Sequence, residues 1–265
     1  MTDQRTLAAS SIVLEDPPLD FEPLPRAARQ LVVFDFDWSL ADQDTDRWVH
    51  EVLSPRLRIE FCRLKPQMQF TDMCAHLLAE LHKEGHSRAD LEGALRRMPV
   101  HPGMVRGVRE LQRKHPGTEF FLLSNSNEVY IGTILPSVGL TEPPLFTEIV
   151  TNPAHWDGEL LRLSRRIAPD AAEQHTCKVG CSANMCKGDE LDAFRKRHES
   201  YDRIIYVGDG GNDYCPILRL GPNDVAFVRR NRGLAKRIAD EGGVQCTVRY
   251  WTGAWEAEQL LGLLA

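Results

Sequence analysis

The chain has 265 residues, of which 42% are hydrophobic and 26% charged, with a formal net charge of -6. These values are typical of a globular protein of one or two domains, and no apolar run is long enough to span a membrane. The negative charge, together with the lack of an aromatic and basic stripe or a zinc-finger helix pattern, argues against nucleic acid as a partner. Seven cysteines in a chain that needs no disulfides, and an N-terminus without a secretory signal pattern, lead us to expect a cytoplasmic protein with free thiols.

The beginning of the chain divides into a lead-in and a first strand. Clustered prolines among acidic residues, with no helical or alternating period, predict a flexible segment over residues 1–26. The apolar run from Leu31 to Phe34 then ends abruptly in Asp35, which is typical of a strand buried on both faces. Asp35 is therefore expected at the carboxyl end of that strand.

The rest of the chain predicts a doubly wound α/β fold with a cap. Leucines and methionines at helical spacing indicate a small helical cap over residues 48–111. Further strand-like runs at 120–123, 203–207 and 224–228 are each followed by polar or glycine-rich residues and a helical pattern. We therefore assign residues 27–47 and 112–265 to a core with a parallel sheet, and place the cap above the carboxyl edge of that sheet.

Carboxylates follow two of the predicted strands. Asp35 and Asp37 belong to D-F-D-W-S, and Asp209 and Asp213 belong to G-D-G-G-N-D. Two further D-x-D patterns within residues 42–46 follow no buried strand, so they are expected in a solvated loop. If the first four carboxylates share one sheet edge, each pair at about 4 Å repels by about 4 kcal/mol at an effective dielectric of about 20. Such a cluster requires a cation, and all-oxygen ligation suits Mg²⁺.

Two weaker signals concern phosphate binding. Ser124 and Asn125 follow the second strand and offer hydroxyl and amide donors, although such residues often only form a turn or a helix cap. Lys187 in N-M-C-K-G is a candidate cation for a nucleophile and a phosphate, whereas an isolated lysine is more often on the surface. Whether these residues bind phosphate depends on whether they lie beside the predicted carboxylate cluster.

Taken in order, D-F-D-W-S, L-L-S-N-S, M-C-K-G and G-D-G-G-N-D resemble the four motifs of haloacid dehalogenase-type hydrolases. From about residue 30 to 250 the chain is similar to the phosphoethanolamine/phosphocholine phosphatase (PHOSPHO-like) family. The segments that carry this similarity are T-D-R-W-V at 45–49, the Cys-rich stretch at 175–187 and G-D-G-G-N-D-Y-C-P at 208–216. The resemblance implies a magnesium-dependent phosphatase with a Rossmann-like core, acting on a small phosphorylated metabolite; the sequence does not indicate an oligomeric state.

The resemblance also implies roles for the acids. Asp35 would attack phosphorus and form an aspartyl-phosphate, while Asp37 protonates the leaving oxygen and later activates water. Mg²⁺ would be held by Asp35, the backbone carbonyl of Asp37 and Asp209, with Asp213 in support. Ser124 and Lys187 would neutralise the phosphoryl oxygens.

The substrate is less well defined by the resemblance. Amino-alcohol phosphatases are thought to receive the positive end of the substrate with two acids, of which Asp46 matches the first while Asn125 replaces the second. Phosphocholine, phosphoethanolamine, pyrophosphate, thiamine monophosphate and pyridoxal phosphate all stay open, as does transfer of the phosphoryl group to an alcohol. Trp38 and Trp48 would either offer a ring face to a cation or simply pack.

The Cys-rich stretch permits a different reading. His175, Cys177, Cys181 and Cys186 are four soft ligands for zinc, although their spacing is not a C-x₂-C pair. Reduced structural thiols are favoured over zinc, and Cys215 is expected to be packed in the interior. A zinc-binding or metabolite-binding protein without turnover is the alternative to an enzyme.

Overall fold

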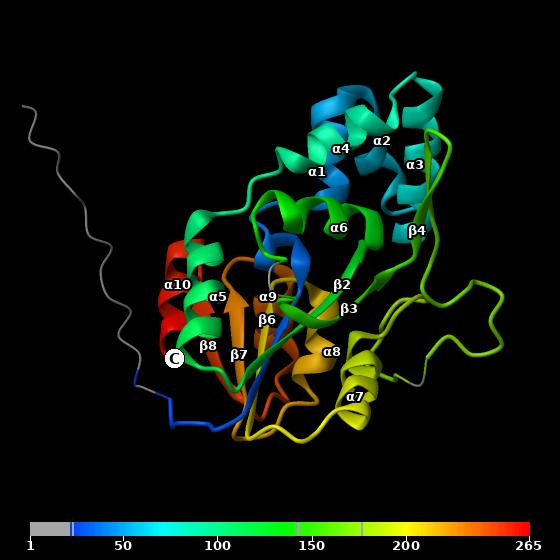
Figure 1. Cartoon of the computed structure of the whole chain (residues 1–265). Helices are drawn as coiled ribbons and strands as arrows, with labels where there is room; N and C mark the ends of the chain where they lie inside the picture. Colours follow the sequence, from blue (N-terminus) through cyan, green and yellow to red (C-terminus); the bar gives the residue numbers. More distant parts are fainter. Residues whose placement is uncertain (1–21, 23, 142–143, 176) are drawn as a thin grey trace, which may run out of the picture.

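The computed structural model describes residues 22, 24–141, 144–175 and 177–265. It shows one parallel sheet covered by helices on both faces, with a group of helices beyond one edge of it (Figure 1). The predicted α/β class with a helical insertion after the first strand is confirmed. The predicted flexible lead-in falls mostly on residues 1–21 and 23, which lie outside the described residues.

The sheet has six strands in the order β3-β2-β1-β6-β7-β8, and all neighbouring pairs are parallel. The strands are β1 (Gln30–Phe34), β2 (Thr118–Asn127), β3 (Phe146–Asn152), β6 (Arg203–Gly208), β7 (Val225–Arg229) and β8 (Thr247–Trp251). The apolar runs predicted β1, β2, β6 and β7. The two edge strands, β3 and β8, were not predicted, because exposed residues interrupt their apolar pattern.

The strands form two cores because successive side chains point to opposite faces. Val32 and Phe34 face one side, and Leu31 and Val33 face the other. Helices on the first side are α5 (Pro102–Lys114), α6 (Glu128–Ser137) and α10 (Ala254–Gly262). Helices on the second side are α7 (Lys187–Arg197), α8 (Tyr214–Ile217) and α9 (Gly233–Glu241). This coverage explains why β1 is apolar throughout.

The order of the strands creates a crevice beside β1. The chain runs from β1 to β2 and β3 on one side and returns through β6, β7 and β8 on the other. Ligands of open α/β sheets bind at such a switch point, outside the carboxyl ends of the strands. The residues that follow β1 and β6, and the last residues of β2, therefore meet at one place.

Four helices between β1 and α5 form the cap: α1 (Thr45–Leu53), α2 (Pro55–Leu64), α3 (Phe70–Lys83) and α4 (Arg88–Arg96). Side chains fix where several of them begin, since Asp44 accepts from the backbone N of Arg47 and Ser87 forms a capping box. A hairpin of β4 (Ala154–Asp157) and β5 (Leu160–Leu163) packs against α3. The helices lie above the carboxyl edge of the sheet (Figure 1).

The division of the chain at residues 48 and 111 stays a prediction, and two observations bear on it. The cap helices begin three residues earlier, at Thr45. Helix α5, most of which falls in the predicted cap range, packs beside α10, where Arg106 pairs with Glu258 at 2.8 Å.

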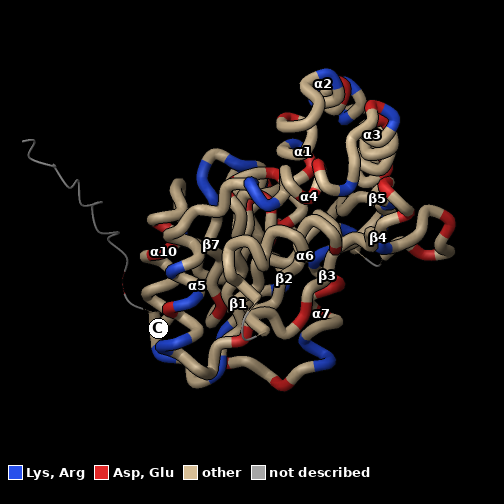
Figure 2. Tube along the Cα trace, turned by 45° about the horizontal axis from the view of Figure 1, so that its top comes forward, with Lys and Arg blue, Asp and Glu red and all other residues tan. Residues whose placement is uncertain are grey.

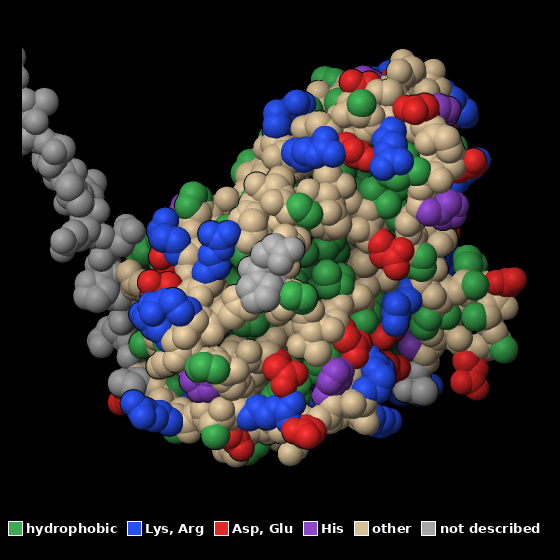
Figure 3. Space-filling view, viewed as in Figure 1, with side chains coloured by type: hydrophobic (Ala, Val, Ile, Leu, Met, Phe, Trp, Pro, Cys, Tyr) green, Lys and Arg blue, Asp and Glu red, His purple; other side chains and the backbone are tan. Residues whose placement is uncertain are grey.

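Charges of both signs are distributed along the chain (Figure 2) and are interspersed on the face seen in Figure 3. On that face (Figure 3) the described residues form no continuous basic stripe. Among the described residues, the helices are all too short or too polar to cross a bilayer.

Candidate active site

Asp35 stands directly after β1, with only 5% of its surface exposed. Its backbone N donates to the carbonyl of Val207 in β6 (2.9 Å), which extends the ladder to this residue. Its Oδ1 accepts from the backbone N of Phe36 (2.7 Å) and lies 2.8 Å from Nζ of Lys187. Both contacts use the same oxygen, so among the described residues Oδ2 has no hydrogen-bond donor.

Asp37 lies in an irregular turn that joins β1 to the cap. Its two carboxylate oxygens accept from the backbone N (2.9 Å) and the hydroxyl (3.2 Å) of Thr45, the first residue of α1. Trp38 has the left-handed φ of 57°, which is uncommon for a bulky residue, and Arg229 holds its carbonyl at 2.9 Å. The turn therefore fixes Asp37 between the sheet and the first cap helix.

Asp213 is the most fully hydrogen-bonded acid of the group. Its Oδ1 accepts from Lys187 Nζ and the hydroxyl of Tyr206, both at 2.7 Å. Its Oδ2 accepts from the backbone N of Asp209 (3.1 Å) and of Gly210 (2.9 Å). Asp213 therefore orients the loop after β6 and holds Lys187 toward Asp35.

Charge in this cluster is only partly compensated. Burial and the nearby Asp213 raise the pKa of Asp35 to about 7, although Lys187 acts in the opposite direction. Burial, with Asp35 and Asp213, raises the pKa of Asp209 to about 8. Burial lowers the pKa of Lys187, but Asp213 and Asp35 outweigh it and raise that pKa above its ordinary value. Lys187 thus pairs with two of the three buried carboxylates, Asp35 and Asp213.

These residues fit a hard divalent cation. Oxygen atoms of Asp35, Asp209 and Asp213 lie within 4.8 Å of one another, and all three residues are buried. An all-oxygen set of few protein groups suits Mg²⁺, which keeps several waters and shares its shell with phosphate. Because Asp213 already accepts four hydrogen bonds, Asp35 and Asp209 have more capacity to bind the ion directly.

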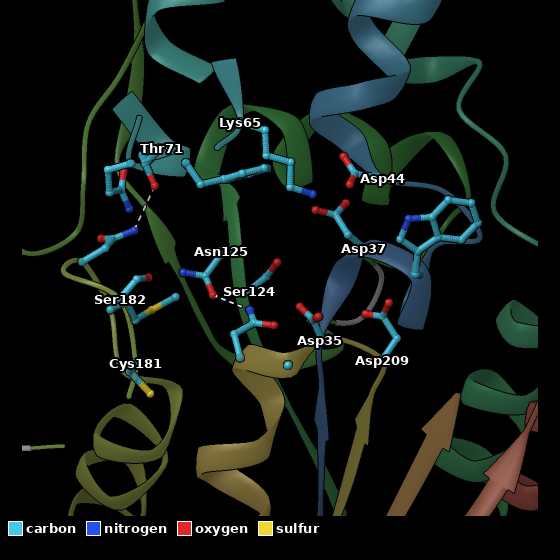
Figure 4. Close-up of a pocket in the computed structure, with 18 of the residues that line it drawn as sticks. Asp35, Asp37, Asp44, Lys65, Thr71, Ser124, Asn125, Cys181, Ser182 and Asp209 are labelled. Atoms are coloured by element: carbon cyan, nitrogen blue, oxygen red, sulfur yellow. Dashed lines mark hydrogen bonds between the residues drawn. The ribbon is translucent and has the colours of Figure 1, made fainter. Parts of the chain in front are cut away.

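A cavity of about 470 Å³ opens between the sheet edge and the cap, within the size range of small-molecule sites. Asp35, Asp37, Ser124, Asn125 and Asp209 line it, and Figure 4 shows their side chains around the same space. The structure therefore brings together most of the residues that the sequence singled out. Lys187 and Asp213 lie behind Asp35, outside the lining.

Ser124 and Asn125 come from the last part of β2. Ser124 is buried, and its hydroxyl accepts from the backbone N of Ser126 (3.1 Å). The side-chain oxygen of Asn125 accepts from Nδ2 of Asn212 (2.8 Å), which links β2 to the loop after β6. Asn152 Nδ2 also holds the backbone carbonyl of Asn125 (2.6 Å). Asn125 is thus held at the cavity wall by two neighbouring segments.

Sequence reasoning missed three charged residues of the cavity wall: Asp44, Lys65 and Arg237. The sequence predicts a solvated loop at Asp44, but Asp44 is the N-cap of α1 and burial raises its pKa. Lys65 and Arg237 follow or belong to helices whose sequence gives no sign of a ligand. Only the packing of the cap over the sheet brings them to the cavity (Figure 4 labels Asp44 and Lys65).

Asp46, the expected acid for a positively charged substrate, lies outside the cavity lining. It is 3% exposed, and burial followed by the charge of Asp44 raises its pKa to about 8. Asp44 occupies the cavity side of α1 instead. The side chain of Asp46 is therefore placed in the interior of the cap and not against a bound substrate.

The two tryptophans are engaged with protein groups. The guanidinium of Arg232 lies 3.7 Å from the ring centroid of Trp38, and that of Arg229 lies 5.3 Å from it. Trp48 Nε1 donates to the carbonyl of Ala94 (2.8 Å) within the cap. Of the two, only Trp38 lines the cavity, and its ring already faces arginine.

The Cys-rich stretch differs from the expected ligand set. Cys177, Cys181 and Cys186 gather around Cys215, which is buried as expected. His175 is not part of the group; its Nε2 is hydrogen-bonded to the carbonyl of Ser182 (3.1 Å).

Comparisons with known proteins identify the family to which the chain belongs. A family model described as "Putative Phosphatase" matches residues 30–264. A thiamine phosphate phosphatase-like protein of Arabidopsis thaliana is 32% identical, with 88% of this chain and 94% of that protein covered. Inorganic pyrophosphatase 2 of Arabidopsis thaliana is 32% identical (87% and 82% covered), and pyridoxal phosphate phosphatase PHOSPHO2 of Mus musculus is 28% identical (85% and 94% covered).

Among solved structures, an apo phosphoserine phosphatase has the same fold, with a TM-score of 0.55 at 18% identity, covering 80% of this chain and 98% of that one. The family match spans the sheet, the cap and every candidate catalytic residue. The chain therefore belongs to the "Putative Phosphatase" family of haloacid dehalogenase-like hydrolases, and it is a phosphatase that acts on phosphoric monoesters.

Proposed function

We propose that this enzyme hydrolyses small phosphate monoesters in two steps through an aspartyl-phosphate on Asp35. The observation that carries the proposal is the position of the Asp35 carboxylate at the cavity floor, with Oδ1 held by Phe36 and Lys187 and Oδ2 without a donor. A carboxylate fixed through one oxygen presents the other for attack in a defined direction.

In the first step Oδ2 of Asp35 forms a bond to phosphorus while the bond from phosphorus to the leaving oxygen breaks. Asp37 is suited to give that oxygen its proton, because burial and the charges of Asp44 and Asp46 raise its pKa well above the ordinary value. In the second step Asp37 takes a proton from water, and the water oxygen displaces the Asp35 carboxylate from phosphorus. The products are inorganic phosphate and the free enzyme.

Electrostatic neutralisation comes from several groups of the chain. Lys187, at 2.8 Å from Asp35, stays charged and lowers the repulsion between that carboxylate and an approaching phosphate. The Ser124 hydroxyl and the Asn125 amide are on the cavity wall, where they can donate to phosphoryl oxygens. Asp35, the backbone carbonyl of Asp37 and Asp209 would hold Mg²⁺, with Asp213 in support. When bound, this ion would neutralise phosphoryl charge and orient the phosphate.

We also propose that the group attached to phosphate is neutral or negatively charged. Lys65 and Arg237 line the cavity, and among the described residues Lys65 has no ion pair. Asp46 lies outside the lining and Arg232 covers a face of Trp38. Asp44, the acid that lines the cavity in place of Asp46, already has the positive charge of Lys65 near it. Pyrophosphate and pyridoxal phosphate, which appear in the names of relatives, fit this wall better than phosphocholine does.

A panel of substrates tests both the proposed hydrolysis and the proposed preference for a neutral or negatively charged group on the phosphate. Purified enzyme with Mg²⁺ is assayed with p-nitrophenyl phosphate, pyrophosphate, pyridoxal phosphate, thiamine monophosphate, phosphoethanolamine and phosphocholine. We expect turnover that EDTA removes and Mg²⁺ restores, and higher kcat/KM for the first three substrates of this panel than for phosphocholine. Stoichiometric zinc with no turnover would instead support a binding protein, and a phosphorylated product on adding an alcohol would identify a phosphotransferase.

A further inference from the structure

Four cysteines from two segments of the chain converge beside the catalytic loops. They are Cys177, Cys181, Cys186 and Cys215. We propose that these four thiolates bind one structural Zn²⁺ ion, separate from the carboxylate site, and that this ion fixes the loop that carries Lys187.

The spacing of the sulfur atoms fits a single tetrahedral ion. Sγ of Cys177 lies 3.5 Å from Cys181 and 3.4 Å from Cys215, and Sγ of Cys186 lies 3.4 Å from Cys215. All four sulfurs lie within 4.8 Å of one another. Tetrahedral zinc with Zn–S bonds of about 2.3 Å requires sulfurs about 3.8 Å apart. The observed separations far exceed a disulfide bond of about 2.05 Å, so the group has the dimensions of a ligand shell.

Groups around the sulfurs complete the arrangement. The backbone N of Val179 donates to Sγ of Cys177 (3.3 Å), and Nη2 of Arg219 lies 3.9 Å from Sγ of Cys215. Four thiolates and Zn²⁺ carry a net charge of −2, which such donors offset. A Cβ on Gly188 would lie 2.6 Å from Sγ of Cys215, so glycine there permits the close approach.

The chain around the cysteines has no regular secondary structure. Between β5 and α7 the described residues form neither helix nor strand, and many are exposed. Cys177 and Cys181 are partly exposed, whereas Cys186 and Cys215 are buried. A metal ion would therefore attach an irregular and partly exposed loop to the interior, which is the usual role of a closed zinc site.

The position of the cysteines connects this site to catalysis. Cys186 directly precedes Lys187 at the start of α7, and Cys215 follows Asp213 by two residues. The ion would thus join the segments that bring Lys187 Nζ to 2.7 Å from Asp213. Lys187 acts on the substrate, while the cysteines position it.

Metal analysis of the whole protein tests the proposal. We expect one zinc per chain after dialysis against EDTA, both in the natural protein and in an Asp35→Asn/Asp209→Asn variant that lacks the carboxylate site. Cys177→Ser and Cys215→Ser should lose the zinc, whereas Cys62→Ser, which removes an exposed cysteine outside the group, should keep it.

Two further measurements keep the test independent of folding. Titration of the natural protein with a mercurial should release the zinc in step with thiol modification, and protein loaded with Co²⁺ should show thiolate-to-cobalt charge-transfer absorption. Natural protein that purifies without stoichiometric zinc, that holds iron instead, or that keeps zinc in the folded Cys177→Ser variant would overturn the proposal.

Discussion

Lys187 Nζ lies 2.8 Å from Oδ1 of Asp35, the oxygen that also accepts from the backbone N of Phe36. The contact links the end of β1 to the start of α7, two segments about 150 residues apart in sequence. In the proposed mechanism this contact leaves the second oxygen of Asp35 to act as the nucleophile and supplies a positive charge where phosphate would arrive. The predictions below follow from this arrangement.

Replacement of Asp35 by asparagine should abolish turnover while the fold persists. The amide is nearly isosteric but cannot form the acyl phosphate, and it removes a buried acid whose pKa is raised to about 7. Assays with p-nitrophenyl phosphate measure the activity, and thermal unfolding with EDTA measures the stability. Asp157→Asn on the exposed β4–β5 hairpin is the matched control and should behave like the natural protein.

Asp37→Asn should slow the enzyme in a way that depends on the leaving group. Loss of a general acid costs ~10²–10⁴-fold for an alkyl phosphate, which needs a proton on its leaving oxygen. The leaving group of p-nitrophenyl phosphate needs no such proton in the first step. The rate of enzyme phosphorylation by this substrate should therefore fall less than the rate with an alkyl phosphate. Equal losses for both substrates would assign the proton transfer to another group.

Lys187→Met should be unstable as well as inactive. Lys187 is 1% exposed and pairs with Asp35 and Asp213, so its removal leaves two buried carboxylates without their cation. Breaking a buried pair in this way costs about 3–5 kcal/mol in the free energy of unfolding. Urea unfolding with and without Mg²⁺ measures this, and Mg²⁺ should recover part of the loss. Lys83→Met on the cap surface should cost far less.

Without Mg²⁺ the protein should become less stable as the pH rises. Asp35 and Asp209 have folded pKa values of about 7 and about 8, above the ordinary 3.8. At any pH between 3.8 and these folded pKa values, the folded state therefore binds more protons than the unfolded state. Their stabilising contribution is complete below about pH 3.8 and is lost as the pH rises through about 7 to 8. The melting temperature in EDTA should therefore fall from about pH 5 to about pH 8.5.

Added Mg²⁺ should reverse this trend, because the ion binds the deprotonated folded state and stabilises it most at high pH. The increase in melting temperature with Mg²⁺ should grow over the same pH range. An increase that is independent of pH would show that these carboxylates are not the groups that bind the ion.

Two substitutions at the cavity wall should alter substrate preference. Asn125→Asp adds a negative charge and Lys65→Met removes a positive one, so each should raise kcat/KM for phosphocholine relative to pyrophosphate by about tenfold, which corresponds to about 1.4 kcal/mol. Lys83→Met serves again as the control. Unchanged ratios in both variants would remove these residues from substrate selection.

The sequence was sufficient for the catalytic acids but not for the cavity wall. Asp35 and Asp209 follow apolar runs of parallel strands, and the carboxyl ends of such strands must meet at one edge. The wall depends on how the cap packs. Asp44 is the N-cap of α1 and lines the cavity, whereas Asp46, in the first turn of that helix, is buried in the cap.

Other features also required tertiary structure. Cys215 joins the cysteines of the loop before α7 only because α8 and α7 pack together, a contact that spacing along the chain cannot reveal. The edge strands β3 and β8 contain exposed residues and lack a continuous apolar run. The pattern of a buried strand therefore does not predict them.

Direct detection of phosphorylated Asp35 tests the central claim. The Asp37→Asn variant, which should form the intermediate from p-nitrophenyl phosphate but hydrolyse it slowly, is mixed rapidly with that substrate, quenched in acid and digested for mass spectrometry. We predict a phosphoryl group on the peptide that contains Asp35, absent when Asp35 is also changed to asparagine. Release of phosphate without an initial burst and without any phosphorylated peptide would contradict the account. A phosphoryl group on a residue other than Asp35 would also contradict it.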